Sequence, residues 1–456
     1  MSLSLYLFSG QSRFRQAVSI ARSGRWVGFE LGIGGKTLLT KEELLLYIEN
    51  EKQAILQRGE AFFQCAELGF CELQTAEKIT NLLDEWGVSY QKEVALTGVI
   101  ATIGKGVGYH IGFAADIDAL PRKDGNGTIH SCGHSIQTTM ALSVLKALSD
   151  SGIVEQTDGR VSFFFTPAEE YIDFAYRDGL IEEGKLEFRS GKQNMIALGC
   201  FDGVDCVLSA HANGEEEAKF DIGSTLAGFM AKKAVFIGRA AHSGAAPHLG
   251  RNTLHGAVLA MNAISFLKDQ FAAECGLRLN PVLTEGGGSV NVIPDRTVLE
   301  TYVRANDNET LFQACQRVDA CFEHCAKALE LQCFISNTAG YLPLKQSKEL
   351  NKTVRQNMLL FCKSEEIIEN PVSGASGDVG DLSFLLPTIQ FGFSGVKGRF
   401  HDDSFMVSDY ENCYITSAKV VLGAIYDLLT EKSRRVYPQK FQQSKKEYLG
   451  RLRTKE

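Results

Sequence analysis

Four segments of this chain end in side chains that bind metal ions in many proteins. The segments are FAADIDALP with Asp116 and Asp118, SFFFTPAEE with Glu169 and Glu170, CVLSAHAN with His211, and GRFHDDSF with His401. Between the strand-like runs, residues 141–148 carry apolar side chains at the period of a helix. This alternation predicts an α/β fold with a mainly parallel sheet and helices on its faces. Because the carboxyl ends of parallel strands meet at one edge, we expect the polar side chains to lie together.

Bulk properties limit the classes of function. A chain of 456 residues exceeds what one hydrophobic core supports, which predicts at least two domains. The formal net charge of −8 argues against nucleic acid or an anionic membrane as the main partner, because both attract basic surfaces. The 12 cysteines are scattered, which is typical of reduced thiols in a cytoplasmic protein. No apolar stretch approaches the ~18 residues that cross a bilayer, so no membrane association is predicted.

The order of the predicted elements divides the chain into three parts. Residues 1–40 form an N-terminal extension, which begins with a stretch rich in arginine and free of acidic residues, as in some transit peptides. Residues 41–225 and 339–456 are predicted to form one α/β domain. Residues 226–338 have the pattern of a β-α-β-β-α-β unit. The sequence therefore predicts a smaller α+β domain inserted into a larger α/β domain.

Local patterns predict individual elements. Thr40 is expected to cap a helix that runs through KEELLLYIENEKQAILQRGEAFFQ. In the inserted unit, residues 252–274 and 308–330 have helical spacing. SVNVIP, residues 289–294, and TVLETYVRA, residues 297–305, are predicted as two strands joined by a turn.

The segment IHSCGHSIQ contains two candidate metal ligands. Cys132 and His134 are two residues apart, and in extended backbone this spacing places both side chains on one side. Thiolate and imidazole together suit borderline-soft divalent metals. The segment has neither the C-x-x-C-H motif of haem attachment nor the C-x-x-C motif of dithiol redox enzymes. A turn of small residues is the alternative, so the metal interpretation depends on the further donors at the strand ends.

The adjacent carboxylates Glu169 and Glu170 are predicted to have two different roles. In extended backbone, adjacent side chains point to opposite sides. One carboxylate can then bind a metal while the other stays free to take a proton from water. Metal-assisted hydrolysis requires this combination, because the ion lowers the pKa of water and a free base accepts the proton.

Together, these motifs resemble the aminoacylase and amidohydrolase branch of the dinuclear metallo-exopeptidases. That branch includes hippurate hydrolase, indole-acetyl-amino-acid hydrolases and p-aminobenzoyl-glutamate hydrolase. The resemblance spans residues 45–430 and rests on the motifs DIDALP, HSCGH, TPAEE, AHSGAAPH, NVIPD with Arg304, and SGDVGDLSFLLP followed by His401. In that family the inserted domain serves as a lid and as the surface for dimerisation.

The resemblance implies roles for the residues of the larger domain. Glu169 matches the general base. Asp118 matches the acid that orients a ligand imidazole or supports the metal shell. The positions that match the ligands of a two-metal centre are Cys132, His134, Glu170, His211 and His401.

The resemblance also implies roles for three residues of the inserted domain. His242 matches a lid histidine that reaches toward the scissile carbonyl, often across the dimer interface. Asn291 and Arg304 match lid residues near the carboxylate of the substrate. For these two residues, a turn amide and a strand-face cation are the alternatives.

The chain departs from the family pattern in three places. Many relatives have C-G-H-D-G-H, where this chain continues from His134 with Ser135-Ile136-Gln137, so the aspartate and second histidine are absent. The segment SGDVGDLSF resembles the p-aminobenzoyl-glutamate subgroup. Residues 170–193 form a longer segment than expected, which we interpret as part of the wall of the substrate pocket.

The predicted function is a cytoplasmic, homodimeric amidohydrolase for N-acyl or N-aroyl amino acids. Two divalent metal ions per subunit, zinc or manganese, are expected to polarise the carbonyl and to activate a water molecule. Glu169 takes the proton, and His242 stabilises the oxyanion. The alternatives are a dipeptidase or carboxypeptidase that uses the same site, and a catalytically silent metal-binding homologue. The retained general base favours an enzyme.

Overall fold

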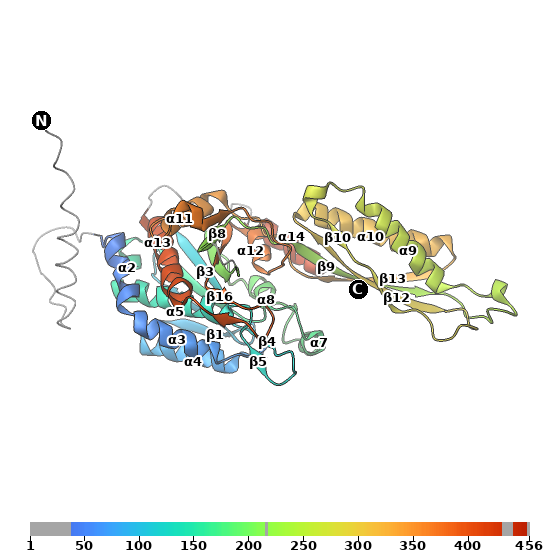
Figure 1. Ribbon diagram of the computed structural model, residues 1–456, viewed down its shortest axis with the longest axis horizontal. Helices are drawn as coiled ribbons and strands as arrows, with labels where there is room; N and C mark the ends of the chain where they lie inside the picture. Colours follow the sequence, from blue (N-terminus) through green and yellow to red (C-terminus); the bar gives the residue numbers. More distant parts are fainter. Residues whose placement is uncertain (1–37, 215–217, 431–440, 454–456) are drawn as a thin grey trace, which may run out of the picture. The chain divides into compact units, whose positions relative to one another are not determined.

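The computed structural model describes residues 38–214, 218–430 and 441–453 (Figure 1). The predicted N-terminal extension therefore lies outside the described residues, apart from its last three positions. Thr40 caps the first described helix as predicted, because its side chain accepts a hydrogen bond from the Glu43 N–H and Glu43 bonds back to Thr40. The helix predicted beyond this cap is divided into two, α2 (Lys41–Asn50) and α3 (Lys52–Phe63).

The larger sheet has the mainly parallel centre that the sequence predicts. In spatial order, its strands are β1 (Tyr90–Val94), β2 (Gly98–Ile103), β6 (Arg160–Thr166), β3 (His110–Asp116), β7 (Cys206–Ala212), β15 (Thr388–Phe393), β8 (Phe220–Ile222) and β14 (Ile367–Glu369). Strands β6, β3, β7 and β15 are parallel, whereas β1 and β2 form an antiparallel edge. Every residue of β3 is buried, as expected for a parallel strand that is covered on both faces.

Helices pack on this sheet and build its core (Figure 1). Helix α5 (His134–Ser151) contacts β2, β3, β6 and β7, and its apolar residues have the helical period seen in the sequence. The other α-helices of this part are α4 (Leu73–Glu85), α6 (Ile153–Gln156), α7 (Phe174–Glu182), α8 (Gly191–Ala197), α11 (Lys348–Met358), α12 (Val379–Leu385), α13 (Ser417–Thr430) and α14 (Phe441–Leu452). Two short strand pairs complete it: β4 (Leu120–Pro121) with β5 (Thr128–Ile129), and β16 (Val396–Lys397) with β17 (Met406–Val407).

A second, antiparallel sheet comes from the part of the chain predicted to be inserted. Its strands are β9 (Gly228–Ile237), β10 (Arg278–Leu279), β11 (Val282–Glu285), β12 (Arg296–Ala305) and β13 (Gln332–Ala339). Helices α9 (Thr253–Lys268) and α10 (Asn308–Ala328) pack against β9 and β12 and against each other. The elements follow the predicted order, while the division of the chain into domains stays a prediction.

Two predictions within this second sheet region are wrong. SVNVIP, residues 289–294, belongs to no strand, and the strand that pairs with β12 here is β11. The side chain of Val290 is fully exposed and that of Val292 is 46% exposed, whereas Ile293 is buried, so the segment does not have the alternating burial of a strand. Helix α9 ends at Lys268, six residues before the predicted end at Glu274.

The described residues contain one helical stretch that is long and apolar enough to cross a membrane by length and composition. It runs from Glu411 to Thr430, through a π-helical turn and α13. The expectation that no stretch approaches this length is therefore wrong. About two thirds of the stretch is buried within the protein (67%), and a helix of a protein core passes the same test. The 12 cysteines are all free thiols.

Candidate metal centre and active site

The polar residues at the ends of the parallel strands line one cavity of about 930 Å³. Asp116 ends β3, Glu169 and Glu170 follow β6, and His211 lies near the end of β7. Residues of the second sheet, including Arg304, line the same cavity. The expectation that the strand ends bring these side chains together is confirmed by this arrangement.

Donor atoms form three overlapping groups within the cavity. Each group consists of three residues with ligand atoms within 4.8 Å of one another. The groups are Cys132 with His134 and His211, Cys132 with Glu170 and His401, and His134 with Glu169 and Glu170. All five residues predicted as metal ligands belong to at least one group. The thiol of Cys132 belongs to the first and the second of these groups, so these two groups share one donor.

The turn at Gly133 brings Cys132 and His134 together. Gly133 has a φ of +92°, and His134 is the first residue of α5. The prediction that extended backbone makes the two side chains converge is therefore wrong, since a left-handed glycine does so instead. A Cβ atom at Gly133 would lie 3.0 Å from the Cβ of Ala212, which is another reason for glycine here.

The imidazole of His134 is oriented by Asp118. Its Nδ1 lies 3.0 Å from Asp118 Oδ1, and both side chains are almost fully buried. Its other nitrogen, Nε2, is buried without a hydrogen-bond partner among the described residues. A buried imidazole nitrogen beside a thiol and two carboxylates fits a metal ligand whose second nitrogen is fixed by a carboxylate. The donor set therefore fits a divalent cation.

Glu169 and Glu170 both point into the donor cluster. Glu169 Oε2 lies 3.9 Å from His134 Nε2, and Glu170 Oε1 lies 3.5 Å from His401 Nε2. The preceding residue, Ala168, has a φ of +52°, so the backbone is not extended here. The prediction that the two carboxylates point to opposite sides is therefore wrong. The two carboxylates still differ in their neighbours, because only Glu170 shares a donor group with Cys132 and His401.

Burial and mutual repulsion perturb the acids of this cluster. Burial, followed by the charges of Glu170, Asp378 and Asp116, raises the pKa of Glu169 well above its ordinary value. Burial, followed by the charge of Glu170, raises the pKa of the Cys132 thiol. Burial lowers the pKa of His211 to about 4, and the charge of His134 adds to this effect. Buried acids this close together are stabilised by nearby cations. This is a second observation, after the buried Nε2 of His134, that fits metal ions at this site.

Behind Glu169, the buried Lys192 joins two carboxylates. Its ammonium lies 2.5 Å from Asp378 Oδ1 and also contacts Asp116 Oδ1. Burial opposes ionisation of Asp116, but Lys192 outweighs it and keeps the pKa of Asp116 below its ordinary value. Asp116, which the sequence offered as a further donor, therefore engages Lys192 and Thr166 and belongs to none of the three donor groups.

Arg304 lies in the cavity among aromatic rings. Its guanidinium is 5.1 Å from the ring centroid of Phe229 and 5.4 Å from that of Tyr302. Its Nη1 donates a hydrogen bond of 3.0 Å to the hydroxyl of Ser376. Within the described part of the chain, no carboxylate forms an ion pair with it, so the cation is available to an anionic ligand.

His242 and Asn291 lie apart from the donor cluster. Neither residue lines the cavity. His242 Nδ1 accepts hydrogen bonds from the N–H groups of Gly244 and Ala245, and Asn291 lies beside it, because the Ser243 N–H donates to the Asn291 carbonyl. His242 and Asn291 therefore lie on neighbouring segments, and of the three lid residues only Arg304 lines the cavity.

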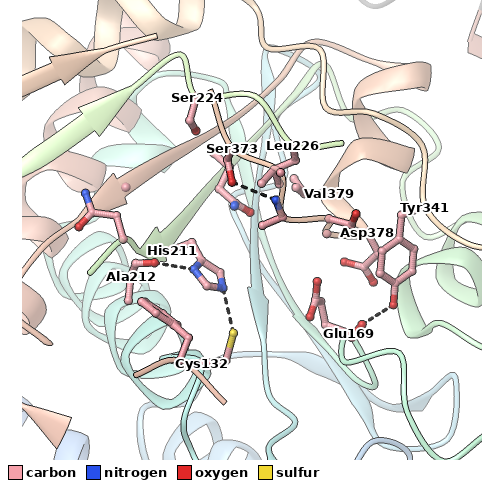
Figure 2. Close-up of a pocket in the computed structure, with 18 of the residues that line it drawn as sticks. Cys132, Glu169, His211, Ala212, Ser224, Leu226, Tyr341, Ser373, Asp378 and Val379 are labelled. Carbon is pink, nitrogen blue, oxygen red and sulfur yellow. Dashed lines mark hydrogen bonds between the residues drawn. The ribbon is translucent and has the colours of Figure 1, made fainter. Parts of the chain in front are cut away.

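Several residues of the site were missed by the sequence analysis. The Tyr341 hydroxyl donates to the Glu169 carbonyl, and Figure 2 shows the two groups facing each other beside Asp378. Lys192 lies in the long segment after Glu170, where a lone lysine gives no signal of burial. Figure 2 also shows the His211 ring directed at Cys132, with 3.5 Å between Nε2 and Sγ.

Comparison with known proteins gives one family. The model described as "Peptidase family M20/M25/M40" matches residues 112–426, more than half of the chain. The resemblance stated from the motifs is thereby confirmed.

Curated relatives carry names of amide hydrolases. The chain is 28% identical over 269 residues to "IAA-amino acid hydrolase ILR1-like 4" of Arabidopsis thaliana, a match that spans just over half (56%) of each protein. It is 29% identical over 385 residues to "N-acetyl-L-cysteine deacetylase" of Bacillus subtilis, covering 79% of this chain and 84% of that protein. It is 29% identical over 338 residues to human "Xaa-Arg dipeptidase", covering 71% and 67%.

Solved structures share the fold at low identity. A putative aminohydrolase from methicillin-resistant Staphylococcus aureus has a TM-score of 0.75 at 19% identity, covering 86% of this chain and all (100%) of that one. A Bacillus subtilis protein described as a dinuclear metal-binding peptidase of family M20 has a TM-score of 0.64 at 19% identity, covering 84% and 99%. At these identities the likeness establishes the fold.

Proposed function

The chain belongs to the M20/M25/M40 peptidase family of hydrolases, and from this premise we propose that it is a metal-dependent amidohydrolase of N-acyl or N-aroyl amino acids. One observation carries the proposal: a largely buried carboxylate, Glu169, belongs to one of three overlapping donor groups in a cavity that also contains the cation Arg304. An amide with a carboxylate on its amine side presents the matching features, a carbonyl to polarise and an anion to bind.

Two divalent ions are proposed to bind between the donor groups. Cys132, His134 and His211 would hold one ion, and Cys132, Glu170 and His401 would contribute to the other. When bound, such ions polarise the amide carbonyl and lower the pKa of water so that it becomes a nucleophile at neutral pH. Asp118 supports this set by fixing the ring of His134.

Glu169 is proposed to move the proton. Its side chain is 13% exposed, its carboxylate lies 3.9 Å from His134, and it is not part of the group that contains Cys132 and His401. It accepts the proton from the attacking water and then donates it to the nitrogen of the leaving amine. Metal ions bound at the donor cluster would supply positive charge that keeps the Glu169 carboxylate ionised at neutral pH. A general base must be ionised to accept a proton.

Arg304 is proposed to bind the substrate carboxylate. A planar guanidinium forms two parallel hydrogen bonds with a carboxylate, and the flanking rings of Phe229 and Tyr302 restrict its orientation. The Ser376 hydroxyl accepts a hydrogen bond of 3.0 Å from Nη1, which also restrains the guanidinium. These contacts support a substrate with a free α-carboxylate over a simple amide.

His242 is proposed to act from a second subunit. In the described chain it does not line the cavity, although the resemblance assigns it to the oxyanion. A homodimer through the second sheet and its helices would bring the histidine of one subunit to the cavity of the other. Asn291, which lies beside His242, would then approach the substrate from the same side.

A substrate panel tests the proposal. The purified protein, supplied with Mn²⁺ or Zn²⁺, is incubated with hippurate-like N-aroyl amino acids, aliphatic N-acyl amino acids and dipeptides, and release of the amine is measured. The account predicts hydrolysis of the acyl or aroyl compounds and weak hydrolysis of their methyl esters, which lack the carboxylate that Arg304 would bind. No hydrolysis of any compound by protein that binds two metals would favour the catalytically silent alternative.

A dipeptidase is the second candidate, because the human relative named Xaa-Arg dipeptidase covers two thirds or more of both chains. The same panel separates the two. Preferential cleavage of dipeptides, with N-acyl amino acids at least ~10-fold slower in kcat/KM, would replace amidohydrolase by dipeptidase without changing the proposed centre.

A further inference from the structure

Arg177 belongs to the long segment that follows Glu170, and the reaction described above gives it no role. It lies on α7, with its side chain almost fully buried (1% exposed). Its guanidinium is 5.4 Å from the ring centroid of Phe70. The hydrogen bonds that it donates within the described residues go to backbone carbonyls. A buried cation that contacts backbone fixes the position of that backbone.

Two of these carbonyls lie on either side of the proposed general base. Nη2 donates to the carbonyl of Glu170 at 2.5 Å, and Nη1 reaches the carbonyl of Ala168 at 3.5 Å. Nη1 also donates to the carbonyl of Arg189 at 2.7 Å, which ties the group to the end of its own segment. One planar group therefore spans the backbone around Glu169.

Other side chains hold the same stretch from different directions. Glu72, which is fully buried, accepts a hydrogen bond of 2.8 Å from the Ala168 N–H. Asp118 accepts one of 2.9 Å from the Glu170 N–H. Figure 2 shows Tyr341 bonded to the Glu169 carbonyl. Each of these side chains holds one peptide group, whereas Arg177 holds two.

The packing around Ala168 is tight. Ala168 has a φ of +52°, a left-handed conformation that a residue with a Cβ adopts only when its surroundings impose it. At Gly69, an added Cβ would lie 2.6 Å from Arg177 Nη2 and 2.8 Å from the Cα of Ala168. Gly69 therefore lets the chain pass close enough for the guanidinium and Ala168 to meet.

We infer that Arg177 is a positioning residue, which fixes the backbone of residues 168–170 and thereby aims the carboxylate of Glu169. The inference deepens the proposed function and rests on Glu169 as the base. The inference also assigns a second role to the long segment after Glu170, besides forming a pocket wall, because this segment contains Arg177. Arg177 itself touches neither substrate nor metal in this account.

Steady-state kinetics of Arg177→Ala and Arg177→Lys test the inference. The matched control is Arg58→Ala, because Arg58 is also an arginine with little exposure (12% of its side chain), lies 5.2 Å from the ring centroid of Trp86, and contacts no part of residues 168–170. Both Arg177 variants are expected to lose ~100-fold in kcat, the typical effect of a small misplacement of a catalytic group, with KM changed less than ~3-fold. Arg58→Ala keeps the wild-type kcat. Wild-type kcat in both Arg177 variants would overturn the inference.

Chemical rescue separates positioning from a general loss of folding. Added guanidinium at millimolar concentration is expected to restore kcat of Arg177→Ala at least ~10-fold, because it can re-form planar contacts with the carbonyls. Ammonium at the same concentration is expected to restore none. Equal rescue by both cations, or by neither, would contradict a role that depends on the planar group.

Hydrogen exchange gives a readout that does not depend on activity. In Arg177→Ala, peptides that contain the amides of Ala168 and Glu170 should exchange at least ~10-fold faster than in the wild type, while peptides of β3 and β7 stay protected. Unchanged exchange in these peptides would overturn the inference, even in a fully active enzyme. If the wild-type protein hydrolyses no amide, the proposed function fails, and this measurement alone decides the role of Arg177.

Discussion

At the scale of single residues, two left-handed positions decide how the donors meet. Gly133 turns the chain between Cys132 and His134, and Ala168 turns it before Glu169 and Glu170. A left-handed alanine costs about 1–2 kcal/mol, so the hydrogen bonds that surround it must offset that strain. Residue spacing identifies the donors but not their directions, because the backbone is left-handed rather than extended at both places.

Glu72 gives a prediction about pH. Burial, followed by the charge of Asp118, raises the pKa of Glu72 to about 8 in the folded protein, whereas an unfolded glutamate has a pKa of about 4.3. Between these values the unfolded chain loses the proton and the folded chain keeps it, so rising pH destabilises the fold through this residue. The variant Glu72→Gln cannot ionise. Its free energy of unfolding relative to wild type should therefore rise from pH 5 to pH 8, by at most about 1.4 kcal/mol per pH unit.

Urea unfolding of both proteins at pH 5 and pH 8 measures this difference. Glu72→Gln keeps an oxygen acceptor for the Ala168 N–H, so the comparison isolates the charge. Parallel pH profiles of the two proteins would show that Glu72 ionises normally in the folded state.

At the scale of elements, the sequence predicted what depends on pattern. The buried strands, α5 with its apolar period and the cap at Thr40 all follow from residue type and spacing. SVNVIP failed because its alternation of apolar residues suits a strand, while Val290 faces solvent in the folded chain. The cations Arg177 and Lys192 could not be predicted, because their burial depends on where a segment of unusual length packs.

The turn that begins α5 gives a prediction for an element. In Gly133→Ala, the new Cβ meets Ala212 at 3.0 Å in a backbone conformation that alanine disfavours. We expect a loss of about 1–2 kcal/mol in the free energy of unfolding and weaker metal binding, because Cys132 and His134 move apart. Thermal denaturation and metal titration measure the two effects.

A matched control for this variant is Gly125→Ala, a glycine that also has a positive φ but has no atom near the added Cβ. It should show the backbone cost alone, with wild-type metal affinity. Equal metal affinity in Gly133→Ala and Gly125→Ala would contradict the role of the turn.

At the scale of the whole molecule, the position of His242 outside the cavity lining leads us to predict an active site shared between two subunits of the proposed homodimer. His242→Ala and Glu169→Gln are each expected to inactivate the protein when present in both subunits. In a mixed dimer, the subunit with intact Glu169 would receive His242 from its partner, which completes one of two sites. Mixed dimers isolated through two different tags should therefore recover about half of the wild-type turnover.

The kcat of the isolated mixed dimer is the measurement. Inactive mixed dimers would mean that His242 serves its own subunit, or that it does not act in the reaction. A monomer in solution would exclude the shared site outright.

Glu169 is proposed to be the base beside a bound metal pair. The most direct test measures metal content by elemental analysis and turnover of an N-acyl amino acid in the same preparations of wild type and Glu169→Gln. We expect two metal ions per chain in both proteins, with turnover reduced by about 10²–10⁴ in the variant. Near-normal turnover in Glu169→Gln with two metal ions bound would contradict it.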